Sequence, residues 1–232
     1  MDKKIKVAII DNSIDATIYT PVEHWKAYLD TEWDAFRAKE HRFPDLRQGH
    51  YSHLILTGSE ASILEREKWV EEEIELVQDA AERDIPVLGS CWGHQLLAVI
   101  FAGPTHVRRA NKPEIGWFPL SIEGDNYLLG ELDQAFVFNS HFDEVIGLGP
   151  QFVVFASTKD CPNHAFKLKG KSIWGIQSHP EMNIAHAKEY LKNNVARKHA
   201  YSSLYSQALD STPKDSEMIH QVTKNFLQSN DL

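Results

Sequence analysis

Residues 87–97 have the sequence V-L-G-S-C-W-G-H-Q-L-L. A short apolar run leads into Gly89, and a helical apolar pattern begins just after Cys91. Glycines on both sides of a cysteine permit a sharp strand-to-helix turn that presents the thiol. Unpaired N–H groups and the positive dipole end at a helix N-terminus stabilise a thiolate. We therefore predict that Cys91 is a nucleophile; the alternative is a structural cysteine that packs as a small hydrophobe.

Strand-like apolar runs alternate with helix-period segments along the chain. The predicted strands are 5–10, 54–56, 85–88, 136–138, 152–155, 165–168 and 173–176. The predicted helices are 21–39, 65–83, 92–102, 184–194 and 218–227, with a polar loop or linker over 201–216. This order predicts an α/β fold with three layers, in which helices flank a mainly parallel sheet. In such sheets the active site lies at the carboxyl ends of the strands.

The bulk composition excludes several classes of protein. With 33 acidic and 24 basic residues among 232, the net charge is −9, which disfavours binding to nucleic acid. No apolar run approaches the roughly 18–20 residues of a membrane span, so we expect no membrane association. The chain has only two cysteines, Cys91 and Cys161, and we find no secretion signal. We therefore expect a cytoplasmic protein without disulfides.

A second motif supplies the groups that a thiol nucleophile needs. Residues 173–181 read I-W-G-I-Q-S-H-P-E, which puts His179 and Glu181 two positions apart at the end of the last predicted strand. Residues two apart in an extended chain point the same way, so the imidazole and the carboxylate can meet. A base oriented by a third group is the usual partner of a cysteine nucleophile. The histidines show no zinc-site spacing, so we expect no metal.

The two motifs together resemble the class I, triad-type glutamine amidotransferases. The resemblance rests on G-S-C-W-G-H-Q at 89–95 and G-I-Q-S-H-P-E at 175–181, with L-T-G-S at 56–59 as a third block. S-H-F-D-E-V at 140–145 and E-I-G-W at 114–117 are similar to relatives of guanylate synthetase. The resemblance implies a flavodoxin-like sheet in one domain over 1–232, with extra helices after about 184.

The resemblance also implies a mechanism. Cys91 attacks the side-chain amide of glutamine, His179 moves the proton, and Glu181 orients His179. The resulting γ-glutamyl thioester is hydrolysed by water, and no metal or organic cofactor takes part. The implied substrate-binding and oxyanion residues are Gly58, Ser59, Trp92, Gln95, Ser140, His141 and Phe142. Many relatives carry two glycines where this chain has Gly58 and Ser59, which leaves open which amide the turn offers.

Several functions remain open at this point. The chain is either the glutaminase component of an amidotransferase made of two subunits, working with a separate synthase, or a free-standing γ-glutamyl peptide or amide hydrolase. Ser59 and His164 depart from the usual pattern and favour a substrate other than plain glutamine. A non-catalytic regulatory protein and the cysteine-containing α/β chaperone-like superfamily fit less well, because the triad is intact. The sequence leaves open a homo-oligomer and the roles of the helix at 21–39 and of the C-terminal helices.

Overall fold

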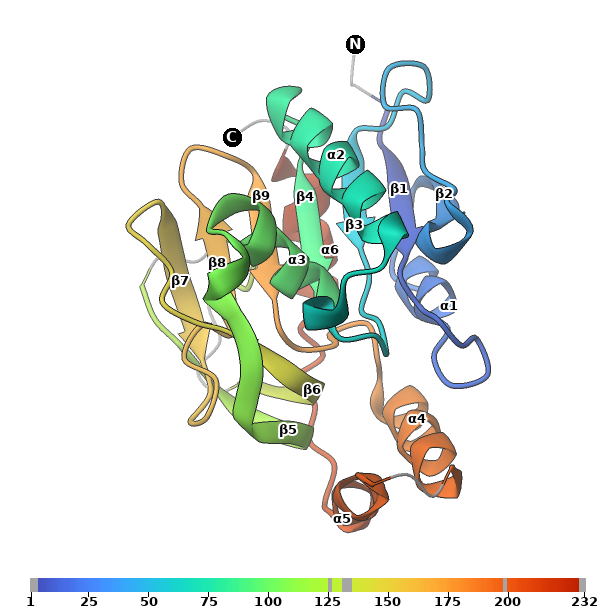
Figure 1. Ribbon diagram of the computed structural model, residues 1–232, viewed down its shortest axis with the longest axis vertical. Helices are drawn as coiled ribbons and strands as arrows, with labels where there is room; N and C mark the ends of the chain where they lie inside the picture. Colours follow the sequence, from blue (N-terminus) through green and yellow to red (C-terminus); the bar gives the residue numbers. More distant parts are fainter. Residues whose placement is uncertain (1–3, 125–126, 131–134, 198–199, 230–232) are drawn as a thin grey trace.

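The computed structural model of the protein describes residues 4–124, 127–130, 135–197 and 200–229. Within these ranges nine strands form one sheet, in the order β2-β1-β3-β4-β9-β8-β7-β5-β6 (Figure 1). The strands are β1 (Lys6–Asp11), β2 (Glu32–Arg37), β3 (His53–Leu56), β4 (Val87–Ser90), β5 (Val107–Ile122), β6 (Ala135–Val145), β7 (Phe152–Ser157), β8 (Ala165–Leu168) and β9 (Ile173–Ile176). The α-helices are α1 (Pro21–Lys26), α2 (Lys68–Glu82), α3 (Trp92–Phe101), α4 (Ile184–Ala196), α5 (Ser202–Asp210) and α6 (Ile219–Leu227).

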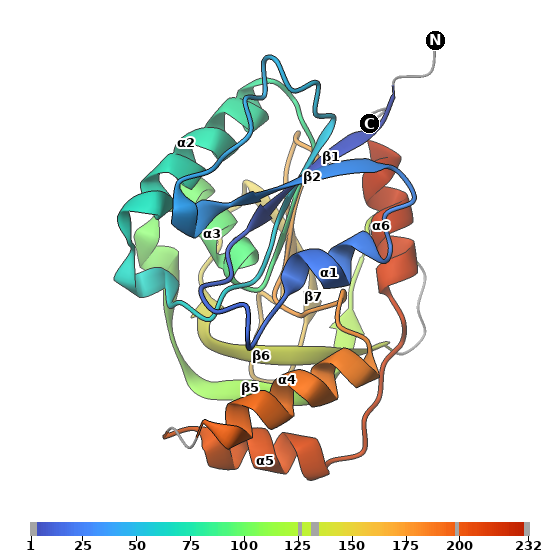
Figure 2. The same cartoon turned by 90° about the vertical axis from the view of Figure 1, so that its right-hand side faces the viewer.

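One half of the sheet is parallel. Strands β2, β1, β3, β4 and β9 run side by side in the same direction. Helices cover both faces of this half: α2 and α3 lie on one side, and α1 and α6 lie on the other (Figure 2). Strands that are buried on both faces favour continuous apolar runs, which explains why β3, β4 and β9 are so easily recognised in the sequence.

The other half of the sheet is antiparallel. The connections 146–151, 158–164 and 169–172, which join β6 to β7, β7 to β8 and β8 to β9, are too short for crossover helices. Strand β8 pairs with β9 and β7, and β5 pairs with β7 and β6, all in antiparallel register. The α/β fold of sheet and flanking helices is confirmed, and the sheet is mixed. The long β5 was not predicted. Its register against β6 shifts between Arg109 and Glu114, and Pro113 lies in that irregularity, where a missing N–H is tolerated.

The predicted helix over 21–39 is wrong in its second half. Helix α1 ends at Lys26, and residues Glu32–Arg37 form β2 at the edge of the sheet. Trp33 and Phe36 fit a helical spacing in the sequence, but β2 pairs in parallel with β1 along all six residues. The free edge of β1 offers backbone hydrogen bonds that outweigh a weak local preference for helix.

The predicted loop over 201–216 is also wrong in part, because Ser202–Asp210 form helix α5. Tyr205 and Ala208 lie one turn apart on α5 and are both buried. They pack with Tyr190 and Leu191 of α4 in a separate small apolar cluster. The polar residues that suggested a loop occupy the outer face of a short amphipathic helix.

Helices α4 and α5 and the hairpin of β5 and β6 gather at one end of the molecule (Figures 1 and 2). This is the end at which the parallel strands terminate at their carboxyl ends. Helices α4 and α5 therefore cover the edge of the sheet where an α/β protein places its active site, whereas α6 packs on a face of the sheet.

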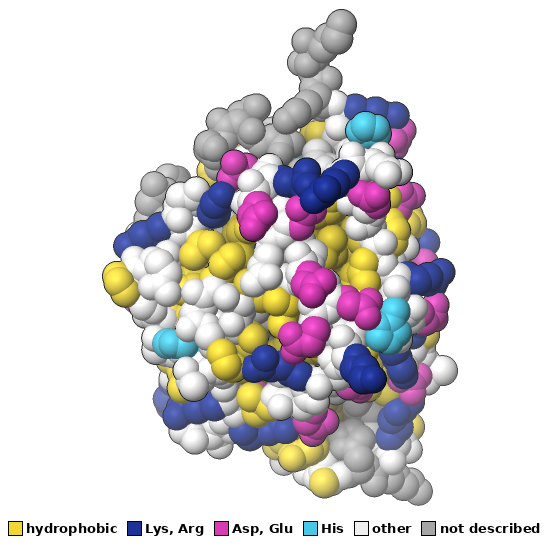
Figure 3. Space-filling view, turned by 45° about the horizontal axis from the view of Figure 1, so that its top comes forward, with side chains coloured by type: hydrophobic (Ala, Val, Ile, Leu, Met, Phe, Trp, Pro, Cys, Tyr) yellow, Lys and Arg dark blue, Asp and Glu magenta, His cyan; other side chains and the backbone are white. Residues whose placement is uncertain are grey.

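The surface is mixed in charge. Acidic and basic side chains intermingle across the face in Figure 3, so the excess of acidic residues does not form one negatively charged patch there. Among the helices in the described part of the chain, none has the length and apolar character required to cross a membrane.

Candidate active site

Cys91 occupies the turn between β4 and α3, in a strained backbone conformation. Its φ of 48° and ψ of −104° lie in a region that L-residues rarely adopt, and only 4% of its surface is exposed. The Cys91 N–H donates to the carbonyl of Ile176 at the end of β9 at 2.8 Å. Its own carbonyl accepts the N–H of Gln95 at 3.1 Å, the first hydrogen bond of α3. The two bonds hold the strained turn between the sheet and the helix.

The glycines beside Cys91 serve close packing. A Cβ on Gly89 would lie 2.5 Å from the carbonyl carbon of Gly93, and a Cβ on Gly93 would lie 2.5 Å from the carbonyl oxygen of Leu56. Cys91 itself has the positive φ, whereas neither Gly89 nor Gly93 does. The glycines therefore let the first turn of α3 rest directly on β3 and β4.

His179 and Glu181 form a buried pair just beyond β9. The Nδ1 atom of His179 lies 2.9 Å from Oε1 of Glu181, and Glu181 is fully buried. The backbone N–H of His179 donates to the carbonyl of Phe138 at 2.9 Å, which ties the segment after β9 to β6. A Cβ on Gly58 would lie 2.7 Å from Cε1 of His179 and 3.4 Å from Cβ of Cys91. Cys91 and His179 are thus both close to Gly58, and Glu181 contacts His179, so the three residues that the sequence predicts as a triad lie together.

The electrostatics of the pair favour a charged imidazole. Burial alone lowers the pKa of His179, but the negative charges of Cys91 and Glu181 and hydrogen bonds to both outweigh it and raise this pKa to about 10. Burial would raise the pKa of Glu181, yet the neighbouring His179 and its hydrogen bonds hold that pKa below its ordinary value. An imidazolium next to a carboxylate is therefore the stable form of the pair at neutral pH.

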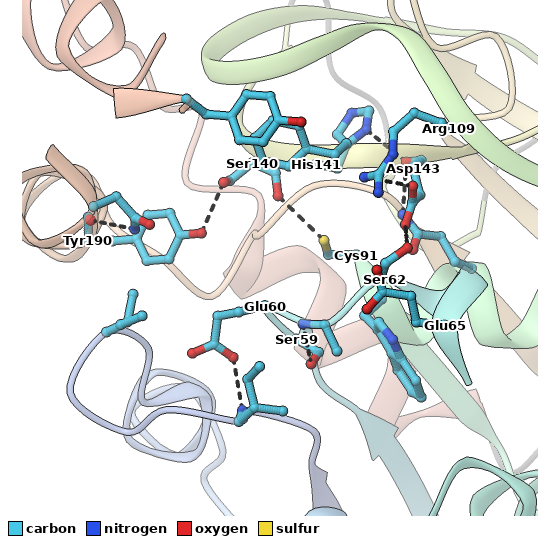
Figure 4. A pocket seen from close by; sticks show the side chains of 18 of the residues that line it. Ser59, Glu60, Ser62, Glu65, Cys91, Arg109, Ser140, His141, Asp143 and Tyr190 are labelled. Carbon is cyan, nitrogen blue, oxygen red and sulfur yellow. Dashed lines mark hydrogen bonds and ion pairs between the residues drawn. The ribbon is translucent and has the colours of Figure 1, made fainter. Parts of the chain in front are cut away.

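A cavity of about 390 Å³ opens beside Cys91 (Figure 4). Six of the seven residues predicted to bind substrate line it: Ser59, Trp92, Gln95, Ser140, His141 and Phe142. Gly58, the seventh, lies just behind Cys91 against His179. The cavity is within the size range of small-molecule sites, and its lining mixes polar and aromatic groups.

Contacts across the cavity fix several of these side chains. The Cys91 thiol points at the carbonyl of Ser140, with Sγ 3.7 Å from the oxygen. The Gln95 amide donates to the carbonyl of Asp143 at 2.9 Å and to Oε1 of Gln177 at 3.2 Å. Cys91 and the substrate-binding candidates on β6 therefore face each other across a narrow space.

A buried network behind β6 supports this wall. The carboxylate of Glu114 accepts hydrogen bonds from Asn139 at 2.7 Å and from Thr158 at 2.5 Å, and it lies 3.1 Å from Nε2 of His141. His164 contacts Asn139 at 3.2 Å in the same network. Glu114 of the E-I-G-W segment and His164 thus belong to a network that supports β6. His164 does not line the cavity, whereas the sequence pattern linked it to the choice of substrate.

Sequence reasoning missed four residues at the site: Tyr19, Arg109, Tyr190 and Tyr205. Tyr19 contacts the His179–Glu181 pair, and the other three line the cavity. Arg109 forms an ion pair with Asp143 at 3.0 Å, and Tyr190 lies 3.1 Å from the hydroxyl of Ser140. These residues lie on loops, on the unpredicted β5 and on α4 and α5, so no single motif connects them. Among the described residues, no three His, Cys, Asp or Glu side chains are placed to hold a metal ion.

Comparisons with known proteins point to one family. The chain is 37% identical over 120 residues to a protein of Pyrococcus abyssi named as one of the subunits of glutamine-hydrolyzing GMP synthase, a match that covers 51% of this chain and 63% of that protein. It is 36% identical over 116 residues to the glutamine-hydrolyzing GMP synthase of Bacillus mycoides, covering 49% of this chain and 22% of that protein. The matched part therefore spans less than two thirds of each relative.

A crystal structure of a glutamine amidotransferase from Thermotoga maritima has the same fold, with a TM-score of 0.76 and 20% identity over 97% of this chain and 99% of that one. The profile of the family described as glutamine amidotransferase class-I matches residues 6–198. The match includes the elbow at Cys91 and the His179–Glu181 pair, and the chain belongs to the class-I glutamine amidotransferase family.

Proposed function

We propose that this protein hydrolyses the side-chain amide of glutamine, or of a related γ-glutamyl compound, through a thioester on Cys91. The observation that carries the proposal is the convergence of a strained, helix-terminal cysteine with a buried imidazole–carboxylate pair. This geometry supplies a nucleophile, a proton carrier and an orienting group in one place.

The reaction has two halves. In the first, the sulfur of Cys91 forms a bond to the amide carbon, and the carbonyl electrons move onto the oxygen. His179 then gives its proton to the departing nitrogen, the C–N bond breaks, and ammonia or an amine leaves. In the second half, water attacks the thioester carbon while His179 takes a proton from it. The C–S bond breaks, which releases a free carboxylate and restores Cys91.

The tetrahedral oxyanion needs preorganised N–H donors. The backbone N–H of Trp92, in the first turn of α3 directly after Cys91, is one donor. The turn at Gly58 and Ser59 supplies the other, since Gly58 lies so near both residues that an added Cβ would be 3.4 Å from Cβ of Cys91 and 2.7 Å from Cε1 of His179. The positive end of the α3 dipole favours the same negative charge.

The amino-acid end of the substrate binds between Gln95 and residues 140–142 on β6. Arg109 adds the positive charge there, because it is the only lysine or arginine among the described residues that line the cavity. Its cross-strand ion pair with Asp143 orients the guanidinium toward the cavity (Figure 4). A guanidinium is well suited to the α-carboxylate of a glutamyl group.

The protein acts as the glutaminase component of an amidotransferase made of two subunits, and it delivers ammonia to a separate synthase. Support comes from two Pyrococcus relatives, which are named as subunits of glutamine-hydrolyzing GMP synthase and share 37% and 35% identity with this chain. In this proposal residues 1–232 form one cytoplasmic amidotransferase domain, to which the helices after about 184 are an addition.

One observation favours a second candidate, a free-standing γ-glutamyl peptide or amide hydrolase. Helices α4 and α5 of the chain itself form a wall of the cavity through Tyr190, Asn194 and Tyr205. With a volume of about 390 Å³, the cavity has room for a leaving group larger than ammonia.

Glutamate release by the purified chain separates the two candidates. The substrates are glutamine and a panel of γ-glutamyl amides and peptides, and Cys91→Ala is the control. Rapid, Cys91-dependent release from one γ-glutamyl compound identifies a free-standing hydrolase. Slow release that rises when a synthase partner is added identifies the amidotransferase component. No Cys91-dependent release under either condition contradicts both.

A further inference from the structure

Tyr19 lies in the loop between β1 and α1, far in sequence from the residues that it contacts. Its side chain is only 2% exposed. The hydroxyl donates a hydrogen bond to Oε1 of Glu181 at 2.6 Å and lies 3.3 Å from Nδ1 of His179. A buried tyrosine hydroxyl ordinarily finds a partner, but here the partner is the orienting carboxylate of the proposed triad.

The contact with Glu181 is specific to one oxygen. Oε1 of Glu181 is also the atom that lies 2.9 Å from Nδ1 of His179. Because an ionised carboxylate can only accept, the tyrosine O–H and the imidazole N–H both donate to this oxygen. Two donors that converge on one atom restrict the rotation of the carboxylate and hold it in line with the imidazole.

The ring of Tyr19 adds a second restraint. It meets the His179 ring edge-on, with centroids 5.5 Å apart and an interplanar angle of 88°. It also meets the ring of Tyr190 on α4, with centroids 6.1 Å apart. Tyr19 therefore connects the His179–Glu181 pair to the helices that wall the cavity.

We propose that Tyr19 is a positioning residue for the reaction: its hydroxyl holds Oε1 of Glu181 in the orientation in which that oxygen accepts the Nδ1–H of His179. This inference rests on the proposed function, because it assigns Tyr19 to the same triad. The hydroxyl acts only through Glu181 and His179 and takes no part in bond breaking.

The hydrogen bond has an electrostatic consequence that can be measured. It helps to hold the pKa of Glu181 below its ordinary value. Burial and the neighbouring Glu181 charge raise the pKa of Tyr19, so the hydroxyl remains a donor throughout the working range. Removing the hydroxyl therefore lets Glu181 take up a proton at a higher pH. Once Glu181 is neutral, the imidazolium of His179 loses its carboxylate partner.

The first test compares Tyr19→Phe with wild-type protein. The phenylalanine keeps the ring and its packing, so a folded protein is expected. We expect kcat to fall about 10- to 100-fold, the effect of losing one hydrogen bond to a charged group, with KM within about twofold. We also expect the acid limb of the kcat profile to move to higher pH. A loss that is uniform across pH, or no loss at all, overturns the inference.

A matched control is available in Tyr51→Phe. The Tyr51 hydroxyl donates to the carboxylate of Asp34 at 2.7 Å, the same kind of bond at a place that does not line the cavity. This variant should leave kcat and its pH profile unchanged. If it changes both as Tyr19→Phe does, the effect is general and the inference fails.

A second readout does not depend on turnover. The rate at which iodoacetamide alkylates Cys91 is measured against pH by peptide mass spectrometry in wild-type, Tyr19→Phe and Tyr51→Phe proteins. Cys161 does not interfere, because it is buried and its pKa is raised by that burial. As the pH is lowered, we expect alkylation of Cys91 to begin to fall at a higher pH in Tyr19→Phe than in the wild-type and Tyr51→Phe proteins. Identical curves in all three proteins overturn the inference. A wild-type protein that cleaves no substrate refutes the proposed function, whereas the alkylation curves still decide the role of Tyr19.

Discussion

Gly58 and His179 are packed so closely that a methyl group on Gly58 would lie 2.7 Å from Cε1 of the imidazole. The same methyl would lie 3.1 Å from the Tyr19 hydroxyl and 3.4 Å from Cβ of Cys91. Gly58 thus has a packing role in addition to its place in the predicted oxyanion turn. Its missing side chain leaves the space in which the nucleophile, the imidazole and the positioning tyrosine meet.

Gly58→Ala should therefore inactivate the protein while leaving it folded. The added methyl must displace the imidazole, and a displacement of about 1 Å costs on the order of 100-fold in rate. We expect kcat for glutamate release to fall at least that far, with a cooperative thermal unfolding transition retained. Full activity in this variant would contradict the close packing of Gly58 against His179.

His179 should titrate far from the range of an ordinary histidine. Negative charge on Cys91 and Glu181 raises its pKa to about 10, so its proton should be retained through neutral pH. Cys91→Ala removes one of these charges and should lower the pKa of His179. The Hε1 resonance of His179, followed by NMR against pH in both proteins, measures this. An ordinary titration near pH 6.5 in the wild-type protein would refute the ion-pair description.

The buried Glu73 on α2 should make stability fall as pH rises. Burial raises its pKa to about 8, against an ordinary value of 4.5, so the native state holds a proton that the unfolded chain releases in this interval. The unfolded state then binds fewer protons, and the free energy of unfolding declines from about pH 4.5 to pH 8 and levels off above it.

Glu73→Gln is the matched variant, because a glutamine can still accept the hydrogen bond that Asn12 donates to Glu73 at 3.0 Å. It should be increasingly more stable than the wild type from pH 4.5 to pH 8, as measured by urea unfolding at several pH values. A constant difference across this range would show that Glu73 does not titrate as described.

Arg109 and Arg108 offer a direct comparison of two neighbouring arginines. Arg109 pairs with Asp143 at 3.0 Å and lines the cavity, whereas Arg108 pairs with Glu144 at 2.9 Å and does not. Arg109→Gln should raise the KM for glutamine by about 10- to 100-fold, since a charged hydrogen bond to the α-carboxylate is lost. Arg108→Gln should leave KM within about twofold.

A substrate change isolates the proposed contact. Glutamine with an amidated α-carboxyl group should be a poor substrate for the wild type, and Arg109→Gln should discriminate far less between it and glutamine. Equal discrimination by both proteins would show that the guanidinium does not bind the α-carboxylate.

Much of the fold could be predicted from the sequence because buried strands and amphipathic helices leave strong local patterns. Strands β8 and β9 were predicted at their observed bounds, and β1, β3, β4 and β7 within two residues at each end. Only residues 136–138 of the longer β6 were predicted, and β5 was missed. Strand β2 and helix α5 were not, because their identity depends on what they pack against. Trp33 and Phe36 suit a helix locally, but the free edge of β1 determines that they form a strand.

The candidate site, too, could be predicted only in part from the sequence. Cys91, His179 and Glu181 could be found because each lies in a short motif at a strand end. Tyr19, Arg109 and Tyr190 reach the site from a loop, a long hairpin strand and a late helix. Only the folded chain brings them together, so no local pattern of residues marks them.

The central claim is that Cys91 forms a γ-glutamyl thioester, and the most direct measurement is to trap it. The protein is mixed with glutamine or the best γ-glutamyl substrate, quenched in acid within one turnover, and digested for mass spectrometry of the peptide that contains Cys91. The account predicts a γ-glutamyl adduct on Cys91 that is absent from Cys91→Ala and disappears as glutamate is released. Substrate turnover without an adduct on Cys91, or at an equal rate in Cys91→Ala, would contradict it.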